Sequence, residues 1–315
     1  MATYKEINGT NIEAVSSDPS NPVLGQVWYN TTTNVLKGVG YVATGSWSTG
    51  GNLNTARYAL GGAGNSNDSA LVFGGAPSGV TAATESYNGS SWTEVNDLNV
   101  AKYYISGTGT QTAALALGGA PPPTGTGATE SWNGTCWAEV NDLNTGRLQV
   151  AGVGTQTSAL VFGGSPNPKA VTESWNGTCW AEVNDLNTGR AALGGAGTQT
   201  AALGFGGNVS PNAQTESYNG TCWAEVNDLN TGRAALGGAG IQTLAVAFGG
   251  YPVTGVTEEW NGSSWTEVAD LSTARESLAG TGTQASALAV GGLPLTAATE
   301  EWIGAGPAVV TFTDS

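Results

Sequence analysis

The sequence predicts an all-β protein built from repeated four-stranded sheets, and three observations support this. Glycine supplies 49 of the 315 residues, too many for a helical protein and without the strict every-third spacing of collagen. The phrase SWNGTCWAEVNDLNTGR occupies residues 131–147 and recurs unchanged at residues 174–190. Asn-Gly pairs lie between aromatic and β-branched residues, which is typical of β-hairpins.

The repeat has a nearly constant length. Double glycines begin at residues 74, 118, 163, 206, 249 and 291, so the steps are 44, 45, 43, 43 and 42 residues. A Thr-Glu pair follows each of them. Six copies of this length fit the blades of a β-propeller and exceed one coil of a parallel β-helix. We therefore predict a six-bladed propeller over residues 41–303, an attachment segment at residues 1–40, and a tail or strand at residues 304–315.

Each copy is expected to contain four strands, as its third occurrence illustrates. Residues 150–156 are small and glycine-rich, which suits a strand crowded near the axis. Residues 160–162 are apolar and stop at a double glycine that can adopt positive φ. Residues 172–183 form a hairpin whose Asn176-Gly177 turn is predicted to be type I′, with positive φ at both central positions.

The last copy lacks a fourth strand of its own. Tryptophan begins that strand in the other copies, but residues 275–302 contain no equivalent. We expect the segment around Trp47 to supply it and to close the ring, because Trp47 precedes Arg57 by the ten residues found elsewhere. A competing closure uses Val309 to Phe312.

The repeat resembles a known family. A double glycine that ends the second strand, an aromatic hairpin and a tryptophan that begins the fourth strand are similar to the kelch-type propeller repeat, over residues 44–302. This likeness implies fold and not function. The Asn-Gly turns, low charge and near identity of the copies depart from familiar kelch repeats. The galactose-oxidase propeller is also similar, but its copper chemistry needs histidine, which this chain lacks.

Charged residues recur in register, and we interpret them as structural. Six of the nine cations occupy one equivalent position, at Arg57, Lys102, Arg147, Arg190, Arg233 and Arg275. A glutamate leads each third strand, at Glu85, Glu130, Glu173, Glu216, Glu258 and Glu300. Because a site that is needed once would not be copied six times, we expect a ring of ion pairs that ties neighbouring blades together.

Composition argues against most catalytic classes. The absence of histidine removes the Ser-His-Asp triad, the Cys-His pair and histidine metal sites. The acids outside the repeat form no obvious catalytic pair, so a glycoside hydrolase is only the third hypothesis. We expect no catalytic residue, metal ligand or cofactor. The net charge of −15 argues against a nucleic-acid partner.

Export, membrane insertion and disulfide bonding are not expected. The first fifteen residues lack the features of a secretory signal, and no apolar run is long enough to span a bilayer. Cys136, Cys179 and Cys222 occupy one position of the repeat, where other copies have serine. We predict free thiols, because equivalent positions on successive blades should be too far apart for a disulfide.

The N-terminal segment carries a second resemblance. Residues 25–38, GQVWYNTTTNVLKG, are predicted to form two strands joined by a Thr/Asn hairpin tip. They resemble segments near the start of tail-fibre and other appendage proteins of tailed phages. This resemblance implies a virion protein that is made in the host cytoplasm and released by lysis, in agreement with unpaired thiols.

We therefore expect a non-enzymatic structural or receptor-binding component of a phage particle. Its expected partners are other virion proteins and a host surface glycan, and a homo-oligomer is left open. A cellular carbohydrate-binding adhesin or lectin is the alternative. Recognition is assigned to the loops between the double glycine and Thr-Glu, which are residues 76–83, 120–128, 165–171, 208–214, 251–256 and 293–298. The candidate contacts are Asn167, Lys169, Asn208, Asn212 and Tyr251.

Overall fold

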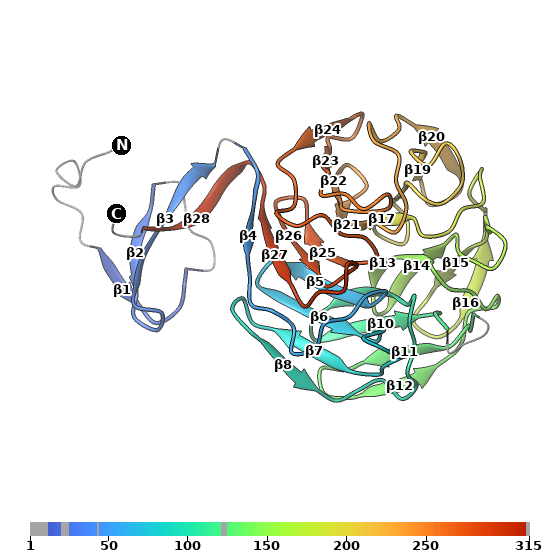
Figure 1. Cartoon of the computed structure of the whole chain (residues 1–315), viewed down its shortest axis with the longest axis horizontal. Helices are drawn as coiled ribbons and strands as arrows, with labels where there is room; N and C mark the ends of the chain where they lie inside the picture. Colours follow the sequence, from blue (N-terminus) through green and yellow to red (C-terminus); the bar gives the residue numbers. More distant parts are fainter. Residues whose placement is uncertain (1–11, 20–24, 43, 121–124, 313–315) are drawn as a thin grey trace. The chain divides into compact units, whose positions relative to one another are not determined.

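The computed structural model describes residues 12–19, 25–42, 44–120 and 125–312. Throughout these residues the regular elements are β-strands, which confirms the all-β class (Figure 1). The chain divides into two compact units. We call Ser46–Ile303 the repeat unit, and Met1–Gly45 with Gly304–Ser315 the terminal unit. No helix in the described part of the chain is long and apolar enough to cross a membrane.

The repeat unit consists of four-stranded antiparallel sheets in a propeller-like arrangement. Five of the sheets use four consecutive strands each, and we number them in chain order. Sheet 1 contains β5 (Gly61–Ser66), β6 (Ser69–Phe73), β7 (Thr84–Tyr87) and β8 (Trp92–Val95). Sheet 2 contains β9 (Ser106–Thr110), β10 (Ala113–Leu117), β11 (Thr129–Trp132) and β12 (Trp137–Val140). Sheet 3 contains β13 (Ala151–Thr155), β14 (Ser158–Phe162), β15 (Thr172–Trp175) and β16 (Trp180–Val183).

The remaining sheets of the repeat unit follow the same order. Sheet 4 contains β17 (Gly194–Gly197), β18 (Ala202–Phe205), β19 (Thr215–Tyr218) and β20 (Trp223–Val226). Sheet 5 contains β21 (Gly237–Ile241), β22 (Leu244–Phe248), β23 (Thr257–Trp260) and β24 (Trp265–Val268). Sheet 6 contains β25 (Ala279–Thr283), β26 (Ser286–Val290), β27 (Thr299–Ile303) and β4 (Ser46–Thr49).

Sheet 6 joins strands that are far apart in the sequence. β4 pairs antiparallel with β27 and places Trp47 opposite Trp302, as expected for the segment around Trp47. The competing C-terminal segment lies in β28 (Gly306–Phe312), which pairs with β3 (Val35–Val42) in the terminal unit. The C-terminal strand therefore does not complete sheet 6.

The outer hairpins turn at the Asn-Gly pairs, but not with the predicted type I′ geometry. Gly177 has a φ of +91°, whereas Asn176, which is also described, does not have positive φ. The Asn176 Oδ1 atom instead accepts hydrogen bonds from the backbone N–H groups of Thr178 and Cys179, both at 2.9 Å. The type I′ assignment was wrong because the asparagine side chain closes the turn, so only glycine needs positive φ.

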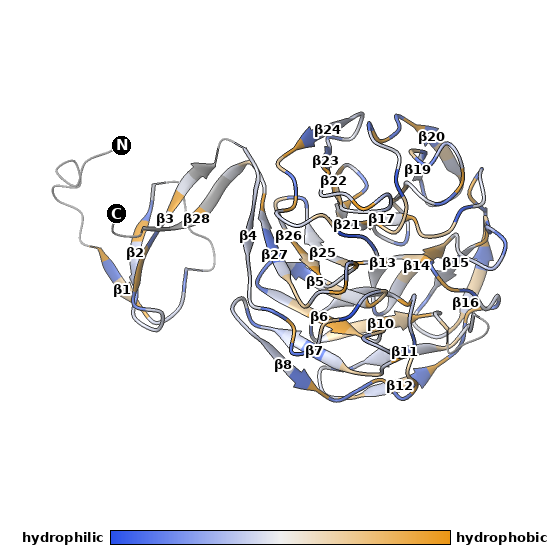
Figure 2. Cartoon of the chain, in the orientation of Figure 1, coloured by the Kyte–Doolittle hydropathy of each residue, from blue (hydrophilic) through white to orange (hydrophobic). Residues whose placement is uncertain are grey.

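The apolar core of the repeat unit lies between neighbouring sheets. Six buried clusters each join two sheets, and one of them joins sheet 6 to sheet 1. Fourth-strand tryptophans reach the preceding sheet: Trp223 contacts the Phe162 ring at a centroid distance of 4.7 Å and donates from Nε1 to Thr172 Oγ1 at 3.1 Å. Apolar colours in Figure 2 are concentrated on strands such as β6 and β10. Burial of these faces stabilises the sheets against one another.

The seam between sheet 6 and sheet 1 differs from the other sheet pairs. Elsewhere a glutamine of the first hairpin donates hydrogen bonds to the preceding sheet. At the seam, Asn67 donates from Nδ2 to the Trp302 carbonyl oxygen at 3.1 Å. The Tyr87 hydroxyl donates to the Glu301 carboxylate and accepts from the Gly51 N–H at 3.2 Å. Gly51 is thus attached to sheet 1, while Gly50, which directly follows β4, donates to the Thr299 carbonyl oxygen of sheet 6 at 2.9 Å.

The terminal unit contains one four-stranded sheet in the order β1 (Glu13–Val15), β2 (Val27–Asn30), β3, β28. β2 and β3 form the hairpin predicted for residues 25–38. Asp18 accepts hydrogen bonds from Trp28 Nε1 at 3.0 Å and Asn30 Nδ2 at 2.7 Å, and pairs with Lys37 at 2.7 Å. Burial raises the pKa of Asp18, but these three partners together hold it below its usual value. Polar residues of the segment 25–38 therefore stabilise its own hairpin.

Candidate functional site

The cation of each copy is buried and paired with the glutamate of the third strand. The nitrogen–oxygen distances lie between 2.5 and 3.1 Å, and the cationic side chains are at most 1% exposed. The pairs are Arg57–Glu85, Lys102–Glu130, Arg147–Glu173, Arg190–Glu216, Arg233–Glu258 and Arg275–Glu300. The predicted ion pairs are thus present, and each cation lies on the linker that follows one sheet and pairs with a glutamate of the next sheet.

The second oxygen of each glutamate connects neighbouring sheets. Asn144 follows β12 of sheet 2 and donates to Glu173 Oε2 of sheet 3 from its backbone N–H at 2.7 Å and from Nδ2 at 2.9 Å. The same side chain donates to the Trp180 carbonyl oxygen at 3.1 Å. In the last copy Ser272 takes the place of this asparagine, and its backbone N–H donates to Glu300 Oε2 at 2.7 Å. The tie between neighbouring copies therefore passes through the carboxylate and a linker side chain.

These charges serve the fold and leave no free cation for a ligand at these positions. Burial lowers the pKa of Arg190, and the facing Glu216 carboxylate offsets part of that effect. Arg57, Arg147, Arg233 and Arg275 behave in the same way, with the glutamate partner in each case opposing the effect of burial. The binding surface must accordingly be sought among other residues.

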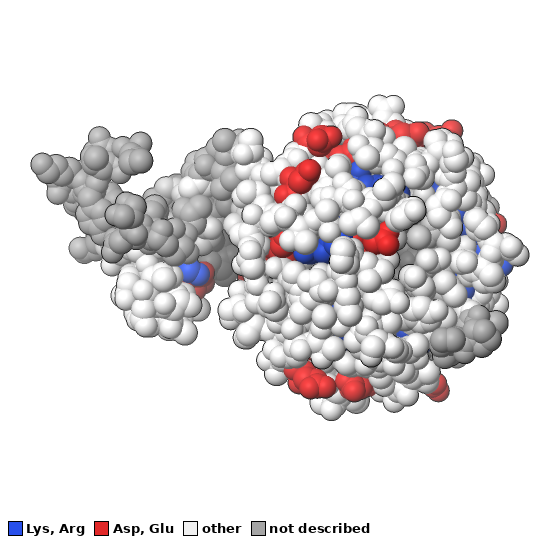
Figure 3. All heavy atoms as spheres, in the orientation of Figure 1, with Lys and Arg blue, Asp and Glu red and all other residues white. Residues whose placement is uncertain are grey.

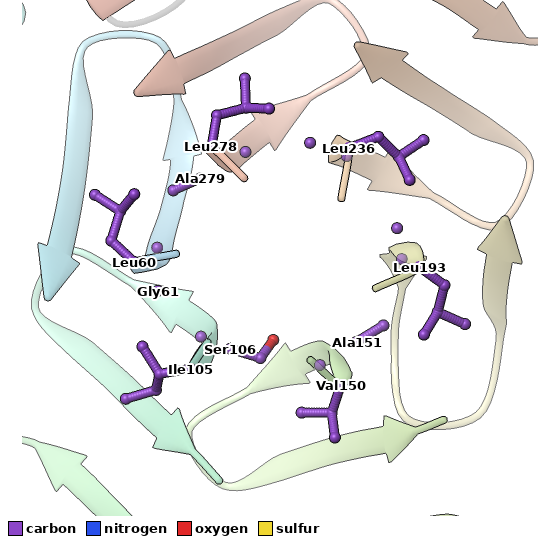
Figure 4. A pocket seen from close by; sticks show the side chains of 18 residues that line it. Leu60, Gly61, Ile105, Ser106, Val150, Ala151, Leu193, Leu236, Leu278 and Ala279 are labelled. Carbon is purple, nitrogen blue, oxygen red and sulfur yellow. The ribbon is translucent and has the colours of Figure 1, made fainter. Parts of the chain in front are cut away.

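The innermost strands surround a central cavity. β5, β9, β13, β17, β21 and β25 are edge strands of their sheets, and each contributes residues to the cavity wall. One part of the cavity has a volume of about 130 Å³ and a second part about 220 Å³, and the same six glycines border both: Gly62, Gly107, Gly152, Gly195, Gly238 and Gly280. Figure 4 shows branched side chains such as Leu193 and Leu236 pointing away from the middle of the cavity.

A closed ring of six backbone hydrogen bonds lies at one mouth of this cavity. Each N–H donates to the carbonyl oxygen of the equivalent residue in the preceding sheet, at 2.7 to 3.0 Å. The members are Ala59, Tyr104, Gln149, Ala192, Ala235 and Ser277. All six have φ between 51° and 56°, although none is glycine. The ring therefore fixes an uncommon backbone conformation and holds six side chains around a recess of about 90 Å³.

The side chains at this mouth differ between copies of the repeat. Residues 131–147 and 174–190 are identical, yet the dipeptides that follow them are Leu148-Gln149 and Ala191-Ala192. Equivalent dipeptides in sheets 1, 2 and 6 are Tyr58-Ala59, Tyr103-Tyr104 and Glu276-Ser277. The Tyr103 and Tyr104 rings are in contact, with centroids 4.7 Å apart. Aromatic and polar groups are therefore gathered on one side of the ring, facing alanines on the other.

No family model and no curated protein matches this chain. The function must therefore be argued from the geometry of the site. Figure 3 shows acidic groups both near the margin and toward the middle of one face of the repeat unit, with basic groups beside some of them.

The loop residues predicted as contacts have different environments. Tyr251 is 60% exposed and pairs through its backbone with Ala234, which precedes a member of the hydrogen-bond ring. Asn167 is exposed, and Lys169 is half-buried. Tyr251 therefore lies beside the mouth, where an aromatic ligand contact is possible.

Asn208 and Asn212 contribute to the scaffold. The Asn208 Oδ1 atom accepts the Ala191 N–H at 2.9 Å, and the Asn212 carbonyl oxygen accepts the Arg233 N–H at 2.9 Å. Other copies form a backbone bridge at this position; here the Asn208 N–H still donates to the Ala191 carbonyl oxygen at 3.0 Å, and the side-chain oxygen takes the place of the second backbone acceptor. Residues 121–124 of the second predicted loop lie outside the described residues.

Sequence reasoning missed the mouth residues because it searched for differences in loop length. Tyr58, Tyr103, Tyr104 and Glu276 lie in segments of constant length that directly follow the buried cation. Their signal was a change of residue type directly after a phrase that recurs in each copy. Among the described residues, no group of three His, Cys, Asp or Glu side chains could hold a metal ion.

The three cysteines are exposed and unpaired. We expect thiol titration of the unfolded, non-reduced protein to detect all three, and the native protein to react fully because the hairpin turns are accessible. Replacement of all three by serine, the residue at Ser91 and Ser264, should leave the melting temperature unchanged. Detection of only one free thiol before reduction would mean that the other two cysteines form a disulfide, and would contradict this prediction.

Proposed function

We propose that this chain is a non-enzymatic receptor-binding protein of a phage particle, whose repeat unit is a closed six-bladed kelch-like propeller. The closed hydrogen-bond ring and the core cluster between sheets 6 and 1 support closure. The kelch-like landmarks support the family reading, and residues 25–38 support an appendage of a tailed phage. The terminal unit then attaches the protein to other virion components.

The proposed ligand is a host surface glycan, bound at the mouth that the hydrogen-bond ring surrounds. The observation that carries this proposal is the change of residue type at the mouth: the identical phrases at residues 131–147 and 174–190 are followed by Leu148-Gln149 in one copy and by Ala191-Ala192 in the other. Tyrosine rings can pack against the apolar faces of sugars, while Gln149 and Ser277 offer hydrogen bonds to hydroxyl groups. A rigid wall of paired backbone holds these groups in place without a rearrangement on binding.

Binding to immobilised oligosaccharides tests this proposal. We expect the purified full chain to bind a subset of them, and the double variant Tyr104→Ala, Gln149→Ala to bind at least about tenfold more weakly. Alanine is already present at Ala59 and Ala192 with the same backbone φ, so the variant should fold.

The matched control changes the opposite hairpin turns. Thr135, Thr178 and Thr221 are exposed in equivalent turns, and their combined replacement by alanine should leave binding unchanged. Equal losses in both variants, or no retention of any oligosaccharide by the unmodified chain, would overturn the assignment of glycan binding to the mouth.

A further inference from the structure

Four side chains form a distinct corner of the mouth, which we call the tyrosine–glutamate corner: Tyr58, Tyr103, Tyr104 and Glu276. Tyr58, Tyr103 and Glu276 hold equivalent positions in sheets 1, 2 and 6, which follow one another around the hydrogen-bond ring. The ring bonds fix their order, because Ala59 donates to the Ser277 carbonyl oxygen and Tyr104 donates to the Ala59 carbonyl oxygen, each at 2.8 Å. The glutamate and the tyrosines are therefore neighbours.

The corner is half-buried and aromatic. Tyr103 and Tyr104 meet at an interplanar angle of 41°, and Tyr104 also lines the recess of about 90 Å³. Burial raises the pKa of Tyr104, and the nearby Tyr58, Tyr103 and Glu276 raise it further, so these groups are close enough to influence one another. Three aromatic side chains thus lie next to one carboxyl group.

The carboxyl group has no cationic partner in the described structure. The ion pairs recorded for the described residues are the six buried pairs and Lys37–Asp18, and none includes Glu276. Burial raises the pKa of Glu276, which reflects the cost of a partly desolvated charge. A ligand cation would relieve that cost, and a neutral hydroxyl group would relieve it less.

We propose that the tyrosine–glutamate corner binds the positively charged amino group of a saccharide, so that the preferred ligand class is a glycan with free amino sugars. This inference rests on the proposed function and adds the chemistry of the ligand. A cation beside tyrosine faces gains electrostatic energy from the rings and pairs with the carboxylate. The net charge of −15 also favours the approach of a cationic glycan.

Matched oligosaccharides test the inference. The probes are a β-1,4-linked glucosamine tetramer and its fully N-acetylated counterpart, measured by calorimetry with the full chain at low salt and at a pH where the amines are charged. We expect the amino form to bind at least about tenfold more tightly. Added salt should weaken the binding of the amino form much more than that of the acetylated form.

Variants identify the groups responsible. Glu276→Gln should remove most of the preference for the amino form. The control is Glu267→Gln, at an exposed position of β24, which changes the net charge equally and should preserve the preference. Tyr103→Phe keeps the aromatic face and should retain the preference, whereas Tyr103→Leu should reduce it. Thermal unfolding of each variant should match that of the unmodified chain, since these side chains lie outside the buried core clusters.

The outcomes separate the two proposals. Equal binding of both tetramers, or an unchanged preference in Glu276→Gln, would overturn the amine site and leave glycan binding at the mouth intact. Failure of the unmodified chain to bind either tetramer or any other oligosaccharide would overturn both.

Discussion

Replacement of Arg190 by methionine is expected to lower the free energy of unfolding by about 3–5 kcal/mol. The guanidinium group donates to Glu216 Oε1 at 3.0 Å and to the Gly206 carbonyl oxygen at 2.8 Å, in a fully buried setting. Methionine fills part of the volume but leaves the carboxylate and that carbonyl group without this donor. The loss therefore reflects an unpaired buried charge and not only a missing attraction.

The chain itself supplies the control for this variant. Lys102 occupies the equivalent position in sheet 2 and pairs with Glu130 at 3.1 Å. Arg190→Lys should accordingly cost less, about 1–3 kcal/mol, because the pair survives and only part of the hydrogen bonding is lost. Urea unfolding followed by tryptophan fluorescence and circular dichroism measures both variants. If methionine were tolerated as well as lysine, the buried pairs would not be needed for stability.

Replacement of Trp47 by alanine is expected to lower the free energy of unfolding by about 3 kcal/mol. The indole ring lies 4.9 Å from Phe248 and 5.2 Å from Trp302 between ring centroids, and its Nε1 atom donates to Thr257 Oγ1 at 3.0 Å. Its loss removes contacts within sheet 6 and between sheet 6 and sheet 5. Deletion of residues 1–50 removes β4 entirely and leaves β27 as an unpaired edge, which favours aggregation.

A second tryptophan distinguishes the two units in this experiment. Trp28 is fully buried in the terminal unit, and Trp28→Ala should disturb that unit while the main unfolding transition of the repeat unit stays in place. Differential scanning calorimetry of both variants makes the comparison. An unchanged main transition in Trp47→Ala would mean that β4 contributes little to the repeat unit.

Repetition made the local structure of the repeat unit predictable. The strands, the buried cation–glutamate pairs and the fourth strand around Trp47 could be anticipated because each uses residues that recur at fixed spacing. The type I′ turn was wrong because the Asn176 side chain competes with backbone geometry for the same N–H groups. Such competition is settled by local hydrogen bonding, which residue preferences describe only on average.

The candidate site was harder to predict because it depends on which sheets are neighbours. Tyr58, Tyr104 and Glu276 belong to different copies, and their proximity follows from the order of the hydrogen-bond ring. Residue spacing within one copy carries no information about this proximity. Asn208, an exposed loop residue predicted as a ligand contact, also has a structural role: its Oδ1 atom accepts the Ala191 N–H, which the residue type alone does not indicate.

The contacts between sheets 6 and 1 differ from those of the other sheet pairs, and this difference matters for folding because the sheets are similar to one another. Sheets 3, 4 and 5 present almost the same surfaces, so during folding any of them could dock against the wrong neighbour at little energetic cost. Asn67, Tyr87 and Glu301 make the contacts that join the first and last sheets, and Asn67 stands where the other copies have glutamine. Because Asn67 is shorter than the glutamine of the other copies, it favours the docking of sheet 1 against sheet 6 over its docking against another sheet.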